Sequence, residues 1–215
     1  MQFADSRVAE VFADYDARHR RELAAARDLP RGAFGARRDD FLLPVGAEVG
    51  AFLQALVIGR EAKTVLELGT SYGYSTLFLA DAARECGAMV ISIDVDSDKQ
   101  AYAGQMLERA GLREWVEFRC GDAVSLLAEE PGPWDVVLLD IWKDAYVACF
   151  EAVYPALAEE AIIVSDNMIY PEGAREAVRA YRKAVKAKAD LQTVLMPLGS
   201  GIEVSVKWSA ANAKL

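Results

Sequence analysis

Two apolar runs of the sequence end abruptly in side chains that could bind a metal ion. Residues 136–139 lead directly into Asp140, and residues 161–164 are soon followed by Asp166 and Asn167. Short apolar runs are typical of buried strands, and the ligands of an open parallel sheet gather beyond the carboxyl ends of its strands. Two carboxylates and an amide oxygen form a hard-oxygen set that suits Mg²⁺. We therefore expect a site at Asp140, Asp166 and Asn167 for Mg²⁺ or another divalent cation, such as Mn²⁺ or Ca²⁺.

Other side chains near these two runs could serve the substrate of such a site. Lys143 is a candidate general base, because a nearby divalent cation and partial burial would lower its pKa and leave it able to accept a proton. Trp142 fits ordinary packing, but beside a metal-binding carboxylate it is also a candidate wall for an aromatic ring. Tyr170 and Pro171 follow the second run and are further candidates for the pocket lining. Asp144 is expected only to cap the next helix.

An earlier strand, VLEL, is followed by residues that favour a nucleoside cofactor without phosphates. Gly69 lets a ligand approach the backbone closely, and Ser75 could cap the following helix. The segment lacks the GxGxxG fingerprint of pyrophosphate binding, and Glu67 would repel phosphate but suit an ammonium group. Asp94, at the end of the next strand, is placed to accept both hydroxyls of a ribose. Asp122 could accept from the exocyclic amine of adenine, or could be only a helix cap.

Composition and charge narrow the classes of partner. The net charge of −9 argues against nucleic acid, whose phosphates reward Lys and Arg, although basic residues gather at 175–188 in a pattern typical of a solvated helix face. No apolar run reaches the roughly 18 residues of a membrane span, and the N-terminus lacks the apolar segment of a secretory signal. We therefore expect a cytoplasmic protein with no membrane contact. The only histidine, His19, is expected at the surface without a catalytic role.

Helical and strand patterns alternate through most of the chain, which predicts an α/β fold with helices on both faces of a parallel sheet. Two helices, at about 4–28 and 45–58, come first. The expected strands are 64–68, 89–94, 115–119, 135–140 and 161–166, and the expected helices are 75–85, 97–110, 123–128, 145–157 and 172–188. Two last strands, 192–196 and 202–207, are separated by too few residues for a crossover helix and must pair antiparallel.

Several of these segments together resemble the class I S-adenosylmethionine (SAM) methyltransferases. The resemblance is carried by ELGTSYGYS from Glu67, by Asp94, by GDA from Gly121, by DIWK from Asp140 and by DN from Asp166, and it spans about residues 41–207. More narrowly, these segments are similar to the metal-dependent catechol and caffeoyl-CoA O-methyltransferase family and its small bacterial members. The resemblance implies a Rossmann-like, seven-stranded, mostly parallel sheet with an antiparallel last strand. We expect one domain, 1–215, with an N-terminal helical cap at 1–58 and the Rossmann-like core at 59–215.

The resemblance also implies roles for individual residues. Asp94 would hold the ribose of SAM, Asp122 and Ala123 the adenine, and Lys143 would be the general base. The residues that would contact the methionine part of SAM are Val45, Glu67, Gly69, Thr70, Ser71 and Ser75. Asp140 is expected to bind the cofactor as well. The implied activity is SAM- and Mg²⁺-dependent methyl transfer to a hydroxyl of a small catechol-type acceptor by a homodimer.

The sequence departs from mammalian catechol methyltransferases at two places. Ile141 stands where they have a histidine on the adenine side, and the late loop at 198–201 lacks their acidic residue, as in plant and bacterial members. Residues 31–43, which would cover the substrate, show no pattern that identifies an acceptor.

Two other functions remain open. One is a tRNA hydroxyuridine O-methyltransferase, which only the basic residues at 175–188 favour and the net charge opposes. The other is a non-methylating nucleoside- or NAD-binding protein, which Glu67 and the missing GxGxxG fingerprint oppose.

Overall fold

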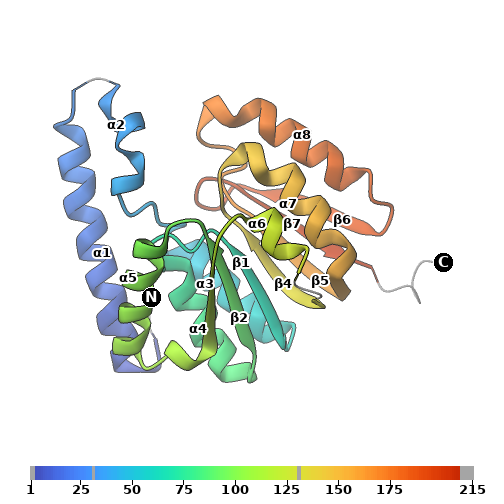
Figure 1. The fold of residues 1–215 in the computed structure, drawn as a ribbon, viewed down its shortest axis with the longest axis horizontal. Helices are drawn as coiled ribbons and strands as arrows, with labels where there is room; N and C mark the ends of the chain where they lie inside the picture. Colours follow the sequence, from blue (N-terminus) through green and yellow to red (C-terminus); the bar gives the residue numbers. More distant parts are fainter. Residues whose placement is uncertain (1–2, 31, 130–131, 209–215) are drawn as a thin grey trace.

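A single sheet of seven strands organises the chain in the computed structural model, which describes residues 3–30, 32–129 and 132–208 (Figure 1). The strand order is β3-β2-β1-β4-β5-β7-β6, so the order reverses between β1 and β4. The strands are β1 (Thr64–Leu68), β2 (Met89–Asp94), β3 (Val116–Cys120), β4 (Trp134–Leu139), β5 (Leu157–Ser165), β6 (Leu191–Met196) and β7 (Ile202–Lys207). β7 pairs antiparallel with both β5 and β6, whereas β1 to β5 pair parallel with one another. The predicted α/β class with an antiparallel ending is confirmed.

Helices cover both faces of this sheet and form two separate cores. One core contains α1 (Ser6–Arg27), α3 (Ala47–Gly59), α4 (Tyr74–Cys86) and α5 (Ser97–Ala110), and the other contains α6 (Ala123–Leu127), α7 (Tyr146–Val153) and α8 (Arg175–Lys186). Successive strand side chains alternate between the two: Val65 belongs to the first core and Leu66 to the second. This alternation follows from the two-residue period of a strand, and it explains why the central strands are apolar throughout.

The carboxyl ends of the central strands lie level with one another. Leu68 pairs with Ile93 on one side and with Leu139 on the other, and Leu139 pairs with Ser165. The Asp140 amide donates to the Leu68 carbonyl at 2.9 Å. The residues that follow β1, β2, β4 and β5 therefore meet at one edge of the sheet, beside the point where the strand order reverses.

Several element boundaries differ from the sequence prediction. The helix expected at 145–157 ends at Val153, because a 3₁₀ turn (η4, Tyr154–Ala156) intervenes and β5 begins at Leu157. The helix expected from residue 172 begins at Arg175, since Pro171 opens a 3₁₀ turn first (η5, Glu172–Ala174). Residues 33–40 form the short helix α2 (Ala33–Ala36) and the 3₁₀ turn η1 (Arg38–Asp40).

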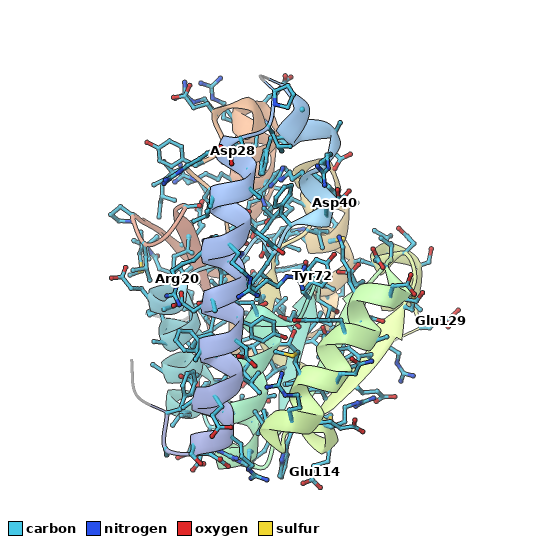
Figure 2. The ribbon with its side chains drawn as sticks, turned by 90° about the vertical axis from the view of Figure 1, so that its left-hand side faces the viewer. Arg20, Asp28, Asp40, Tyr72, Glu114 and Glu129 are labelled. Atoms are coloured by element: carbon cyan, nitrogen blue, oxygen red, sulfur yellow. The ribbon has the colours of Figure 1, made fainter. Side chains whose placement is uncertain are left out.

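The N-terminal helix α1 stands along the side of the sheet that carries α4 and α5 (Figures 1 and 2). Its buried residues Val8, Val11 and Tyr15 recur at helical spacing and face this side. Figure 2 shows Tyr72, from the loop after β1, beside the middle of α1. Among the described residues, no helix has both the length and the apolar character needed to cross a membrane.

Candidate active site

A cavity of about 1040 Å³ opens where the strand ends meet. Most of the predicted site residues line it: Val45, Gly69, Thr70, Ser71, Ser75, Asp94, Asp122, Ala123, Asp140, Trp142, Asn167, Tyr170 and Pro171. Three do not, namely Glu67, Lys143 and Asp166. A smaller hollow of about 370 Å³ lies against α5 and β3 and contains none of the predicted residues. The volume of the larger cavity, about 1040 Å³, is at the upper end of the range for small-molecule sites and is large enough for two ligands side by side.

Gly69 allows the ends of β1 and β4 to approach each other closely. It has φ of +104°, and a Cβ placed there would collide with the carbonyl oxygen of Asp140. A side chain at this position would therefore be strained and would also displace the backbone of Asp140. The glycine serves the placement of Asp140 as well as the approach of a ligand.

Glu67 lies beneath the cavity and not in its wall. One carboxylate oxygen accepts from the Ser75 hydroxyl at 2.6 Å, and the other accepts from the hydroxyls of Thr76 at 2.6 Å and Ser92 at 2.5 Å. Burial raises the pKa of Glu67 to about 7, although these three hydrogen bonds oppose the rise. Ser75 is not the helix cap that the sequence predicted, because Gly73 occupies the N-cap of α4. Glu67 holds the Ser75 hydroxyl at the cavity wall.

Asp94 and Asp122 line the cavity with their carboxylates anchored to backbone amides. Asp94 accepts from the amide of Ser71 at 2.7 Å and from the amide of Asp96 at 2.9 Å. Asp122 is the N-cap of α6 and accepts from the amide of Ser125 at 2.9 Å. The predicted capping role of Asp122 is confirmed, and its position in the cavity wall leaves the ligand role open as well.

Asp140, Asp166 and Asn167 bring a set of oxygen donors to the ends of β4 and β5. Asp166 is only 2% exposed, and its Oδ1 has no hydrogen-bond partner among the described residues. Burial raises the pKa of Asp140, and burial together with the charge of Asp140 raises the pKa of Asp166. The described residues contain no group of three or more His, Cys, Asp and Glu side chains that could hold a metal ion, so a site here would need an oxygen donor of another kind, such as the Asn167 amide.

Lys143 does not line the cavity, and its amine contacts Tyr146. Its Nζ donates to the Tyr146 hydroxyl and to the Ile141 carbonyl at 3.3 Å, and it lies 4.0 Å from the centre of the Tyr146 ring. Burial lowers the pKa of Lys143 to about 8, against the opposing charges of Asp140 and Asp166. The amine is therefore close to losing its proton at neutral pH, but its present partner is a tyrosine.

Several aromatic side chains contribute to the cavity lining. Trp142 is 52% exposed, Tyr170 is 59% exposed, and Phe34 and Phe41 from the segment after α1 are also part of the lining. Asp144 lies in the lining as well and is not the helix cap that the sequence predicted, because α7 has Ala145 as its N-cap, without a side-chain cap bond.

The prediction placed His19 at the surface, but the residue is half-buried; its expected lack of a catalytic role stays a prediction. His19 lines the cavity, and its Nδ1 is buried without a hydrogen-bond partner among the described residues. The missed signal is periodicity: Tyr15 is buried, and the residue four positions on lies on the same helix face. Tyr72 also lines the cavity, although no role was predicted for it. Its carbonyl accepts a hydrogen bond from the Tyr15 hydroxyl at 2.6 Å, and the Arg18 guanidinium lies 3.8 Å from the centre of its ring.

Comparisons with known proteins place this geometry in context. The sequence matches the family model described as O-methyltransferase over residues 34–208. It is 35% identical over 131 residues to a catechol O-methyltransferase from Niastella koreensis, a match that covers 59% of each chain and so less than two thirds of that relative. It is 28% identical over 184 residues to caffeoyl-CoA O-methyltransferase 1 from Arabidopsis thaliana, covering 76% of this chain and 71% of the plant protein.

Similarity to solved structures extends along nearly the whole chain. An O-methyltransferase from Bacillus cereus, solved in complex with S-adenosylhomocysteine (SAH), matches with a TM-score of 0.74 and 25% identity. The match covers 96% of this chain and 93% of that chain, so it includes the N-terminal helices as well as the sheet.

Proposed function

The chain belongs to the O-methyltransferase family and is a SAM-dependent methyltransferase, and from this premise we propose that it methylates one hydroxyl of a small catechol-type acceptor in a Mg²⁺-dependent reaction. The names of its catechol and caffeoyl-CoA relatives suggest this class of acceptor. The observation that carries the metal dependence is the buried, unpartnered Oδ1 of Asp166 beside Asp140.

The cavity divides into a cofactor part and an acceptor part. In the cofactor part, Asp94 would accept hydrogen bonds from the ribose hydroxyls, and Asp122 and Ala123 would contact the adenine. The backbone at Gly69 would lie close to the methionine part. The Ser75 hydroxyl would contact the same part and is held for it by Glu67. In the acceptor part, Trp142, Tyr170 and Pro171 would flank an aromatic ring. The volume of about 1040 Å³ supports the presence of both ligands together.

The donor atoms at the strand ends fit a hard divalent cation. Two neighbouring buried carboxylates repel each other, which is why the pKa of Asp166 is raised by Asp140 as well as by burial. Asp140, Asp166 and Asn167 would hold Mg²⁺, because carboxylate and amide oxygens are its preferred protein ligands. The cation would supply a positive charge that favours the ionised form of an acceptor hydroxyl, whose pKa is otherwise near 10 as in tyrosine.

Lys143 would take the proton from that hydroxyl. To do so its side chain must rotate away from Tyr146 and toward the cavity. Loss of its own proton favours the rotation, since a neutral amine gives up the cation–π attraction to the ring 4.0 Å away. Enclosure of both reactants in one cavity would supply much of the remaining acceleration through proximity and orientation.

The test is methyl transfer from SAM to matched acceptors, followed by release of SAH. Catechol should be methylated at least about a hundredfold faster than phenol, because a site built around two hydroxyl groups is left with unpaired polar groups by an acceptor with one. Equal rates on the two acceptors would contradict the catechol assignment, as would methylation of hydroxyuridine RNA without any turnover of catechols.

A further inference from the structure

Arg38 has no ion-pair partner among the described residues, whereas its charged neighbours Arg37, Asp39 and Asp40 are paired. Arg37 forms an ion pair with Asp40 at 3.0 Å, and Asp39 lies 3.8 Å from Lys99. The Arg38 guanidinium makes no hydrogen bond or ion pair with any described residue. It lies over an aromatic ring, 4.9 Å from the ring centre of Trp142. The neighbouring acids, which would ordinarily neutralise it, already have partners.

This unpaired cation belongs to the wall of the cavity. Arg38 and Trp142 both line it, together with Phe34 and Phe41 from the same segment. The charge of Arg38 opposes the rise that burial causes in the pKa of Asp140 and adds to the fall that burial causes in the pKa of Lys143, so the guanidinium lies within electrostatic range of the acceptor part. His19, with its partnerless Nδ1, is a second polar side chain in the same wall that no cofactor contact proposed above uses.

An arginine in the cavity wall with no carboxylate partner could bind a planar anion. Its fixed fork of N–H donors matches both oxygens of a carboxylate, and aromatic side chains at the wall reduce competition from water. An acceptor ring that packs on Trp142 would displace Arg38 from the indole face. A carboxylate on that ring would give the displaced guanidinium a stronger partner than the ring it leaves.

We propose that Arg38 binds a carboxylate on the methyl acceptor, so that the preferred acceptors are catechol acids and not neutral catechols. Arg38 is then the residue that determines specificity, and the assignment rests on the proposed methyl transfer to catechols. It also accounts for the charged character of residues 31–43, a segment in which the sequence pattern alone identified no acceptor.

The experiment compares protocatechuate, a catechol carboxylic acid, with its neutral amide. Binding of each to the protein saturated with SAH and Mg²⁺ is measured by calorimetry, and kcat/KM is measured with SAM. The wild-type protein should prefer the acid by about 10-fold to 100-fold, the range expected for a hydrogen bond to a charged group. Arg38→Gln should remove that preference by weakening the acid and leaving the amide within about threefold, and Arg38→Lys should restore part of it.

Arg37→Gln is the matched control, because Arg37 is exposed, is paired with Asp40 and is not part of the cavity lining. It should keep the wild-type preference. The proposal is overturned if Arg38→Gln weakens acid and amide equally or weakens neither, or if the wild-type protein binds both equally. Methylation of the amide at the same rate as the acid would overturn only this inference, whereas binding of neither acceptor, together with no turnover of any catechol, would overturn the proposed function itself.

Discussion

Burial determines the protonation chemistry of the side chains at the strand ends. Asp166 is buried and Asp140 and Lys143 are half-buried, and this burial raises the pKa values of the two acids and lowers the pKa of the amine. Each of these pKa shifts suits the role proposed for the residue. Acids short of partners favour a cation between them, and a lysine with a pKa of about 8 can release its proton near neutrality.

The rate of methyl transfer should therefore rise with pH through the pKa of Lys143. Below about pH 8 the amine is protonated and cannot accept a proton, and above it the neutral amine can. We expect kcat to increase across this range in the wild-type protein. Lys143→Met should lower kcat by about 10²-fold to 10⁴-fold, the usual contribution of a general base, and should flatten the profile.

The measurements are a pH–rate profile at saturating SAM and acceptor, and the Kd of SAM by calorimetry. Lys186→Met, on the exposed side of α8, is the control and should keep the wild-type profile. A Lys143→Met enzyme with an unchanged rate and an unchanged pH profile would exclude Lys143 as the base.

At the scale of secondary structure, α1 contacts the loop after β1, which is part of the proposed cofactor site. The Tyr15 hydroxyl donates to the carbonyl of Tyr72, and Arg18 stacks on the Tyr72 ring. Glu22 accepts from Arg18 at 2.6 Å and from the backbone amide of Leu42 at 2.5 Å. One face of the helix thus ties the loop after β1 to the segment that precedes α3.

Removal of the Tyr15 hydroxyl should loosen the cofactor loop. Tyr15→Phe loses one buried hydrogen bond, worth about 0.5–1.5 kcal/mol, so the Kd of SAM should rise by up to about tenfold. Val8→Ala on the same helix is the control: Val8 is fully buried and lies seven residues before Tyr15 in the sequence, so stability should fall while the Kd of SAM stays the same. The Kd is measured by calorimetry, and stability by thermal unfolding. An unchanged Kd in Tyr15→Phe would show that α1 does not position the loop.

The sequence predicted the strand ends better than the surfaces that face them. The apolar run before Asp140 is buried on both sides of the sheet, so its length alone locates the residues that follow it. His19 and Arg38 could not be located in this way. For His19 only the helix face could be predicted, from its spacing to Tyr15, and the place of that face depends on the packing of α1 against α4 and α5. The place of Arg38 depends on the path of the segment after α1, which local pattern does not contain. The partial burial expected of Lys143 is confirmed, but the contact of its amine with Tyr146 is decided by packing.

At the scale of the whole molecule, the sheet brings two half-sites to one edge. In the proposed function, the ends of β1, β2 and β3 would supply the cofactor part, and the ends of β4 and β5 would supply the oxygen donors for the metal. The order β3-β2-β1-β4-β5 places these two groups next to each other at the point where the order reverses. The segment after α1 then forms the wall that faces them, with Arg38 as its unpaired charge.

The central claim, that the two half-sites work together through a divalent cation, is tested most directly by chelation. Methyl transfer from SAM to a catechol is measured in EDTA, and again after excess Mg²⁺ is added back, while the Kd of SAM is followed by calorimetry. Asp166→Asn is compared with Asp98→Asn, which removes an exposed charge at the start of α5. We predict that EDTA abolishes turnover, that Mg²⁺ restores it in the wild-type protein and in Asp98→Asn but not in Asp166→Asn, and that SAM binding survives throughout. Full turnover in EDTA, or full Mg²⁺-supported turnover by Asp166→Asn, would contradict the account.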